Sequence, residues 1–395
     1  MFGKLFRSTL LKREGHMKCE QTVWQAEKGW MPGPPGHSGV SADLVFLFGG
    51  RGQFEDAVFL GSIVGTFPNA VLMGCTTAGE ICDTEVLDRS LVCTAISFRT
   101  TRCRSHCVPI ADSSDGYQVG RELAQKLNAS DLRHVFVFSD GLNINGTELA
   151  HGLTDNLDSC VSLTGGLAAD DDRFAQTYIL CGGEPRSRFV SAAGIYGTDI
   201  RIGCGSLGGW DPFGPERLIT RASGKVLYEL DGMSALDLYR RYLGVHAAGL
   251  PATGLLFPLA IRIRPDAPEL VRTILQINEQ ENSVTFAGDI PEGGYARLMK
   301  ANVDRLIDGA VGAADQCRQA LSGVEAEFAL LISCVGRRML LKQRVEEEVE
   351  GVKDVIGRSA VVTGFYSYGE IAPGNLPGSC ELHNQTMTIT TLNEI

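Results

Sequence analysis

One short motif occurs twice in this chain, once toward each end, and its repetition limits the folds that the chain can adopt. GCTTAGEI spans residues 74–81 and GFYSYGEI spans residues 364–371. Each copy closes a unit in which an apolar strand is followed by a helix and a second apolar strand, and an alternating strand comes after each copy. A unit of the same pattern lies between them and ends in TGGLAADDD. The repetition predicts a body built from related strand-helix-strand units.

The first unit shows the pattern most clearly. DLVFLF at residues 43–48 is typical of a buried strand, and the sequence after it places Ala57, Leu60 and Val64 on one face of a helix. AVLMG at residues 70–74 is a second apolar strand that ends on glycine. The distance from the first strand to the second is that of a βαβ unit.

We therefore expect an α/β fold of mixed α+β character, in which two related strand-helix-strand modules with mixed sheets form a pseudo-symmetric body. The length of 395 residues suits two modules better than one compact core. Between the modules, the segments 190–197 and 200–210 are expected to pair as adjacent strands. The expected divisions are an N-terminal leader and extension at 1–40, a first module at 41–232 and a second module at 233–395.

Composition excludes several classes of function. The net charge of -11 and the lack of a basic stripe argue against nucleic acid as a partner. The longest apolar runs, such as residues 328–335, are too short to cross a bilayer, so we expect no membrane span. Residues 1–17 lack the apolar stretch and cleavage site of a signal peptide, which predicts a cytoplasmic protein. That leader is either frayed or an amphipathic turn that touches a membrane surface or binds a partner.

The cysteines indicate thiols rather than a disulfide scaffold. The chain has 12 of them, scattered through apolar strand-like segments, as expected for reduced and mostly buried residues. CRSHC at residues 103–107 has a metal-like spacing, but two thiols and one imidazole do not close a tetrahedral site.

Four stretches together resemble proteins of the FIST family, from about residue 40 to the end of the chain. The resemblance implies an N-terminal and a C-terminal FIST module in a sensory protein, and within the family it points to the nitric-oxide-sensing haem proteins called NosP. The stretches are GCTTAGEI, TGGLAADDDRFAQTYIL, GKVLYELDGMSALDLYRRYLG and GFYSYGEIAPG with the following ELHNQTMTITTL.

The resemblance implies a function as well as a fold. It implies a sensor that binds haem b, responds to nitric oxide and signals in trans to a histidine kinase, because the two modules extend to the last residues and leave no room for an output domain. A homo-oligomer is compatible with this function. The expected protein is not an enzyme. The alternative is a haem-free sensor module that binds a small, amino-acid-like metabolite through the same loops.

His383 is the candidate axial ligand, and so the candidate metal ligand, of a haem. It lies in ELHNQT, in the C-terminal family motif, and a neutral imidazole can ligate haem iron. A hydrogen-bonded structural histidine is the competing interpretation. Tyr366 and Tyr368 are expected to line an aromatic cofactor pocket, and His246 is a further candidate ligand; packing of the core and plain solvation are their alternatives.

The glycine-ended loops are the expected ligand pocket, because ligands of α/β sheets bind where parallel strands end. The two motif glutamates either hold their own turns through hydrogen bonds or, if both face one cleft, perform acid and base catalysis. Asp170, Asp171 and Asp172 are expected to form a solvated loop, with a hard-cation site as the alternative. The expected pocket residues are Thr76, Thr77, Glu80, Glu370, Asn384 and Gln385.

Overall fold

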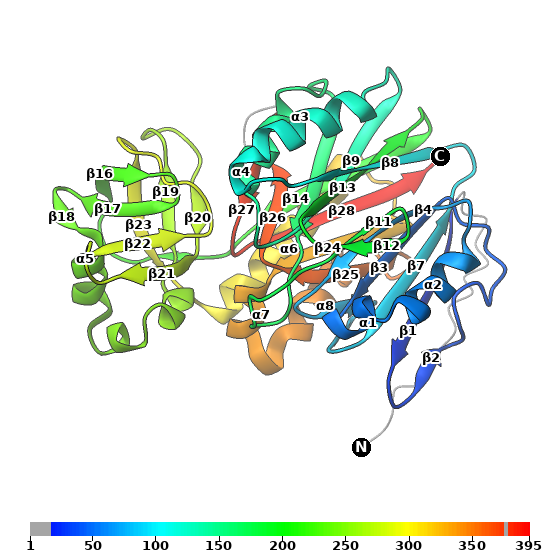
Figure 1. Ribbon diagram of the computed structural model, residues 1–395, viewed down its shortest axis with the longest axis horizontal. Helices are drawn as coiled ribbons and strands as arrows, with labels where there is room; N and C mark the ends of the chain where they lie inside the picture. The colour runs from blue at the N-terminus through cyan, green and yellow to red at the C-terminus, as the bar shows by residue number, and fades with distance from the viewer. Residues whose placement is uncertain (1–16, 375–377) are drawn as a thin grey trace.

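The computed structural model describes residues 17–374 and 378–395, and in it three related units form one body (Figure 1). In each unit two parallel strands flank a helix, and a third strand runs antiparallel to the first of them. The units are β3 (Leu44–Gly49), α2 (Ala57–Thr66), β4 (Val71–Thr76) and β7 (Leu91–Ser97); β9 (Leu132–Ser139), α4 (Gly146–Thr154), β10 (Ser162–Leu167) and β13 (Phe189–Tyr196); and β24 (Phe328–Cys334), α8 (Val345–Ile356), β25 (Val361–Ser367) and β28 (Met387–Glu394).

A hairpin from each unit joins the sheet of another unit. The hairpin of the first unit pairs with β25, that of the third with β10, and that of the second with β4, so the exchange is cyclic. The body therefore has approximate threefold symmetry. The hairpins are β5 (Glu80–Cys82) with β6 (Glu85–Leu87), β11 (Ile179–Cys181) with β12 (Glu184–Arg186), and β26 (Gly369–Pro373) with β27 (Cys380–His383).

An additional strand extends each sheet beside its antiparallel strand. One such strand pairs with β7, one with β13 and one with β28. The resulting orders are β12-β11-β4-β3-β7-β1-β2, β27-β26-β10-β9-β13-β8 and β14-β28-β24-β25-β5-β6. The added strands are β1 (Lys18–Gln25), β2 (Gly29–Met31), β8 (Arg102–Pro109) and β14 (Ile200–Leu207).

The three sheets enclose an aromatic core, and helices cover their outer faces. Phe46 lies 5.4 Å from Phe136 and 5.7 Å from Phe328 between ring centroids, so side chains from all three units meet at the centre. Apolar faces hold the helices against the sheets. The covering helices besides those of the units are α1 (Arg51–Glu55), α3 (Gly116–Leu127), α6 (Val303–Ala320) and α7 (Val335–Leu341).

A small domain, here called the inserted domain, occupies residues 211–300 between β14 and α6 of the third unit. It stands to one side of the body in Figure 1 and has its own core around Ile219, Tyr239 and Phe286. Its elements are β15 (Asp211–Pro212), β16 (Arg217–Ser223), β17 (Val226–Leu230), β18 (Met233–Ser234), α5 (Ala235–Leu243), β19 (Leu259–Arg262), β20 (Leu270–Arg272), β21 (Ile274–Asn278), β22 (Ser283–Phe286) and β23 (Tyr295–Lys300).

The fold class expected from sequence is confirmed: the sheets are mixed and the body is pseudo-symmetric. The structure adds that the middle unit is a full member of the cycle. The expected pairing of residues 190–197 with 200–210 is wrong, because β13 belongs to the second sheet and β14 pairs with β28 in the third. Residues 1–16 of the expected leader lie outside the described residues. Within residues 17–374 and 378–395, every helix is too short or too polar to cross a bilayer.

Candidate functional site

The loops that follow the second parallel strand of each unit meet at one end of the body. Backbone hydrogen bonds connect the loops in a ring. Ala78 N of the first unit donates to Tyr366 O at 2.9 Å, and Tyr368 N of the third unit donates to Leu167 O at 3.1 Å. Ala169 N of the second unit donates to Thr76 O at 2.9 Å. Since each loop donates to a different unit, the ring has the same cyclic order as the hairpins. This is the end of the sheets at which the sequence predicted a ligand pocket.

Glu80 secures the loop of the first unit. Its carboxylate accepts hydrogen bonds from the Thr77 hydroxyl, from Ser90 Oγ at 2.6 Å and from Ser90 N at 3.1 Å. Burial raises the pKa of Glu80 to about 7, against the lowering effect of these hydrogen bonds. The neighbouring Thr76 hydroxyl accepts from Tyr178 N at 3.0 Å, so the polar groups of this loop are already paired.

Glu370 does the same in the third unit. It accepts from Ser367 Oγ at 2.6 Å, from Thr386 Oγ1 at 2.9 Å and from Thr386 N at 3.2 Å. Burial raises the pKa of Glu370 to about 7 as well. The partners of Glu370 are separate from those of Glu80, and each carboxylate fastens its own loop. This arrangement is the turn-holding role that the sequence left open beside catalysis.

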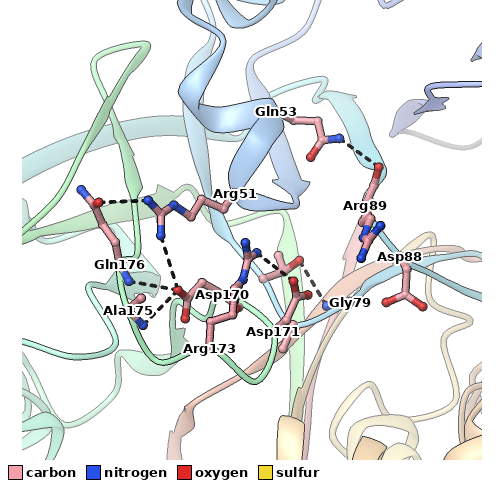
Figure 2. A network of polar contacts seen from close by, with 12 residues as sticks. Arg51, Gln53, Gly79, Asp88, Arg89, Asp170, Asp171, Arg173, Ala175 and Gln176 are labelled. Carbon is pink, nitrogen blue, oxygen red and sulfur yellow. Dashed lines mark hydrogen bonds and ion pairs between the residues drawn. The ribbon is translucent and has the colours of Figure 1, made fainter.

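In the acidic loop of the second unit, Asp172 is exposed and Asp171 is partly exposed, as expected for a solvated loop, whereas Asp170 is folded inward. Asp170 is fully buried, and its carboxylate accepts from Ala175 N at 3.1 Å and from Gln176 N at 2.9 Å. Figure 2 shows both amides and Arg51 directed at this carboxylate, with Arg51 Nη1 at 4.0 Å. Asp171 instead pairs with Arg173 at 2.8 Å. No cluster of three or more metal-ligating side chains occurs among the described residues.

The two tyrosines of the predicted cofactor pocket point to different partners. Tyr366 donates from its hydroxyl to Glu348 Oε1 at 2.7 Å, beneath α8, while Tyr368 donates to Asp170 Oδ1 at 2.5 Å and stacks on Phe174 with ring centroids 4.3 Å apart. Their hydroxyl groups therefore have separate partners, and both rings belong to the packed core.

His246 lies apart from both tyrosines. It belongs to a 3₁₀ turn of the inserted domain, Gly244–Gly249, with its ring 5.9 Å from Phe257. No hydrogen bond or ring contact connects it to His383 within the described part of the chain. His151, in α4, lies 3.4 Å from Glu381 Oε2 through its Nε2.

The loop from β27 to β28 carries a group of neighbouring polar atoms that lack partners. His383 Nε2, both polar atoms of the Asn384 amide and both of the Gln385 amide are buried without a hydrogen bond to any described residue. Asn384 is 1% exposed and Gln385 is 0% exposed. Buried polar atoms in folded proteins are nearly always paired, so five such atoms on three consecutive residues make this loop the candidate ligand site.

The imidazole of His383 is uncharged at neutral pH. Burial, with a further contribution from the charge of Arg272, lowers its pKa to about 4, although Glu381 and a hydrogen bond with the Ala372 backbone act in the other direction. A neutral imidazole offers one lone pair and one N–H group. His383 can therefore accept a hydrogen bond or ligate a metal without first losing a proton.

The surrounding backbone fixes this loop and makes room for its amides. Gln385 has φ of 64°, and its carbonyl accepts from Trp210 Nε1 at 3.0 Å. The next residue, Thr386, accepts from Cys334 N at 3.1 Å through its carbonyl. A Cβ atom at Gly336 would lie 2.5 Å from Gln385 Nε2, so only glycine leaves the space that this side chain occupies.

Sequence reasoning missed Arg272, which approaches the loop from β20 of the inserted domain. Its Nη1 donates to Leu382 O at 2.9 Å, one residue before His383. The signal was present in ELVRTILQIN, where an arginine occupies a position between apolar residues of a predicted strand. A charged residue within such a pattern indicates a buried charge with a specific purpose.

The predicted haem residues fit a haem only in part. His383 has the neutral ring and free Nε2 that axial ligation requires. Tyr366, Tyr368 and His246 have other surroundings, and the unpartnered atoms beside His383 belong to amides. Amides suit a ligand that both donates and accepts hydrogen bonds.

Comparison with known proteins gives two family matches and one curated relative. The FIST N domain matches residues 43–233, and the FIST C domain matches residues 235–373. An uncharacterized protein of Methanocaldococcus jannaschii is 24% identical over 307 residues, which are 71% of this chain and 57% of that protein. The chain thus spans little more than half the length of this relative. The likeness to NosP is not tested by these matches and stays a prediction.

Two solved structures resemble the whole chain at low similarity. A cyanuric acid hydrolase from A. caulinodans has a TM-score of 0.37 and 9% identity, covering 96% of this chain and 98% of its own. A second cyanuric acid hydrolase has a TM-score of 0.33 and 10% identity. The expectation that the chain is not an enzyme is corrected by this finding, since both are enzymes. At these TM-scores the likeness assigns no substrate or reaction to this chain.

Proposed function

The chain belongs to the FIST family of sensory ligand-binding proteins, and from that premise we propose that it senses a small polar metabolite held at residues 383–385. The observation that carries this proposal is the set of five buried atoms without partners on His383, Asn384 and Gln385. An unpaired buried polar group costs roughly 1–3 kcal/mol. A ligand that pairs with these groups recovers part of that cost, which favours the bound state.

The chemistry of the three side chains describes the ligand. Each amide offers two N–H donors and a carbonyl acceptor, and the neutral imidazole offers a lone pair. A partner that satisfies them must therefore carry both donors and acceptors close together. Amino-acid-like metabolites have this character, and they are the haem-free alternative expected from sequence.

A thermal-shift screen tests the proposal directly. The probes are the twenty amino acids, small dicarboxylic acids and the matching amides of each, added to the purified protein. A bound probe raises the melting temperature in a concentration-dependent manner. The free energy of unfolding increases by about 2.7 kcal/mol when the probe concentration is one hundred times its Kd. Gln385→Ala is expected to remove that shift.

The matched control is Gln276→Ala, which shortens an exposed glutamine of β21 in the inserted domain. This variant should keep the full shift. A screen in which no probe stabilises the protein, or in which Gln385→Ala leaves the shift intact, would contradict the proposed function.

Haem b with nitric oxide as the sensed gas is the alternative proposal, and the free Nε2 of His383 is the observation in its favour. Protein supplied with haem should then show a Soret band that nitric oxide shifts and that His383→Ala removes. A preparation without a Soret band contradicts this alternative.

For either ligand, the proposed partner is a histidine kinase regulated in trans, and the family resemblance alone supports it. The autophosphorylation rate of a candidate kinase, measured with ligand-free and ligand-loaded protein, provides the test. An identical rate in both states argues against this partner.

A further inference from the structure

Two arginines are fully buried in the described part of the chain, and they differ in one respect. Arg337 forms an ion pair with Glu348 at 2.7 Å, and both side chains are 0% exposed. Arg272 is 2% exposed and forms no ion pair with any described residue. An uncompensated buried charge is among the most costly features that a protein can hold. The charge of Arg272 therefore calls for an explanation that the fold alone does not give.

The guanidinium of Arg272 meets only backbone carbonyls. Nη1 donates to Leu382 O in the body at 2.9 Å, and Nε donates to Asp289 O in the inserted domain at 3.2 Å. Nη2 makes no hydrogen bond to any residue in the described ranges. Gly288 leaves the space for this group, because a Cβ atom there would lie 2.7 Å from Arg272 Nε. The arginine is thus held in place with one nitrogen still to be paired.

The two acidic residues nearest in electrostatic effect have other partners. Glu381 lies 3.4 Å from His151 through its Oε2, and Asp289 accepts from Asn145 Nδ2 at 3.2 Å. Both act on Arg272 only through the electrostatic field. Neither carboxylate is in a position to neutralise the guanidinium by direct contact.

Arg272 also adjoins the residues proposed to bind a ligand. The carbonyl that it contacts belongs to the residue before His383, and its charge is one of the influences on that imidazole. An unpaired cation therefore lies near the imidazole of His383, the first of the three residues with unpaired polar atoms. Charge on one side and amides on the other suit a molecule with an anionic end and a polar remainder.

We infer that Arg272 is the anion-binding residue of the site at residues 383–385, and that the ligand is a small metabolite bearing a carboxylate. This inference rests on the proposed function, since it names the class of ligand for the same site. A carboxylate carries the single negative charge that one guanidinium balances. A phosphate monoester carries about 1.5 to 2 charges and would leave part of its charge buried and unpaired.

The site then has two halves that belong to different parts of the molecule. Arg272 comes from the inserted domain, whereas Asn384 and Gln385 come from the body. Arg272 already contacts the body through Leu382 O. A carboxylate held by both halves adds a further link between the inserted domain and the body, so ligand binding strengthens the contact between them.

The test compares each acid with its own amide on the unmodified protein. Every amino acid or dicarboxylic acid that stabilises the protein in the screen is titrated by calorimetry beside its carboxamide, which has the same shape without the charge. The acid should bind about tenfold to a hundredfold more tightly, the range expected for a hydrogen bond to a charged group. This comparison needs no variant, so it does not depend on how a substitution affects folding.

Two variants then assign the preference to its residue. Arg272→Gln should reduce binding of the acid to the level of the amide and leave binding of the amide unchanged, while Arg272→Lys should restore part of the preference. The control is Arg262→Gln in the adjacent strand β19, whose side chain already pairs with Glu216. It should retain the full preference.

The outcomes separate this inference from the proposed function. If no probe binds, or if binding does not depend on Gln385, the proposed function fails and the inference fails with it. If binding depends on Gln385 but acid and amide bind equally, or if Arg272→Gln keeps the acid preference, the inference alone is overturned.

Discussion

Glu370 combines full burial with an ionisable group, which gives the stability of the protein a specific pH dependence. Its pKa is about 7 in the folded chain and about 4.5 when the carboxyl group is free. A raised pKa means that the protonated form fits the fold better, so this stabilisation is complete below pH 4.5 and is lost as pH rises through 7. The same reasoning holds for Glu80.

Replacing Glu370 by glutamine should remove that dependence. Relative to the parent protein, the Glu370→Gln variant is expected to be more stable at pH 8 than at pH 5 by about 3 kcal/mol, the equivalent of the pKa change. Urea unfolding of both proteins at the two pH values measures it. Because His383 titrates in both proteins, its contribution to the unfolding free energy cancels when the variant is compared with the parent at each pH. An equal difference at the two pH values contradicts the prediction.

Of the residues in the proposed site, the sequence pointed to those that lie in the family motif and missed the one outside it. His383, Asn384 and Gln385 follow one another in ELHNQT, so a motif reaches all three. Arg272 is distant in the chain, and only the packing of the inserted domain against β27 brings it to the same place. Sequence spacing holds no record of that contact. Tyr366 lies within β25, whereas Tyr368 lies between β25 and β26, and the two tyrosines bind different partners.

Among the strands, a glycine recurs at one position of all three units. Gly74, Gly165 and Gly364 occupy the same register in the second parallel strand of each unit, opposite Leu47, Val137 and Leu331 respectively. A Cβ atom there would lie 2.2, 1.9 and 1.9 Å from the carbonyl oxygen of that opposite residue. A backbone atom cannot move away as the end of a side chain can. These positions therefore require glycine for the strands to approach each other.

Gly165→Ala should consequently destabilise the protein by roughly 3 kcal/mol or more, the upper range for overpacking in a core. The comparison variant is Gly61→Ala in α2, where a Cβ atom meets nothing within 4 Å. In a helix that change should stabilise by up to about 1 kcal/mol. Urea unfolding of the two variants measures both signs. Equal effects on stability would show that the strand glycine is not needed for close approach.

Individual strands and helices could be predicted, but their pairing could not. The expected strand at residues 43–48 corresponds to β3, and the expected helix corresponds to α2, although Leu60 and Ile63 are its buried residues and Ala57 is exposed. Apolar periodicity is a local property and is visible in the sequence. The predicted pairing of β13 and β14 was wrong because β14 joins the sheet of the third unit beside β28, and contacts between distant parts of the chain leave no local pattern.

For the whole molecule, the exchange of hairpins predicts that the body unfolds as one. Each unit depends on two others for hydrogen bonds, so no unit has a stable boundary of its own. Trp24 reports on the first sheet, together with Trp30, and Trp210 lies beside the third unit. Two variants are compared, one that keeps only Trp210 and one that lacks only Trp210. In each variant, tryptophan fluorescence and far-ultraviolet circular dichroism should change at the same urea concentration.

Transitions that separate for either variant would mean that one unit opens before the others. In that case the cyclic hydrogen bonds between loops would contribute little to cooperativity. These probes do not report on the inserted domain separately, although it has a core of its own. Trp210 packs in a cluster that contains both Met299 of the inserted domain and Leu306 of the body, so its fluorescence responds to either part.

The cyclic exchange of hairpins also constrains the ancestry of such a chain. A polypeptide with a single unit would have one hairpin without a sheet and one sheet without a hairpin. Identical copies would complete one another only on closing into a ring of three, which is a symmetric trimer. Fusion of three genes would turn that trimer into one chain in which each copy can vary separately. The inserted domain, present in one copy alone, would then make the three sites of the ring unequal.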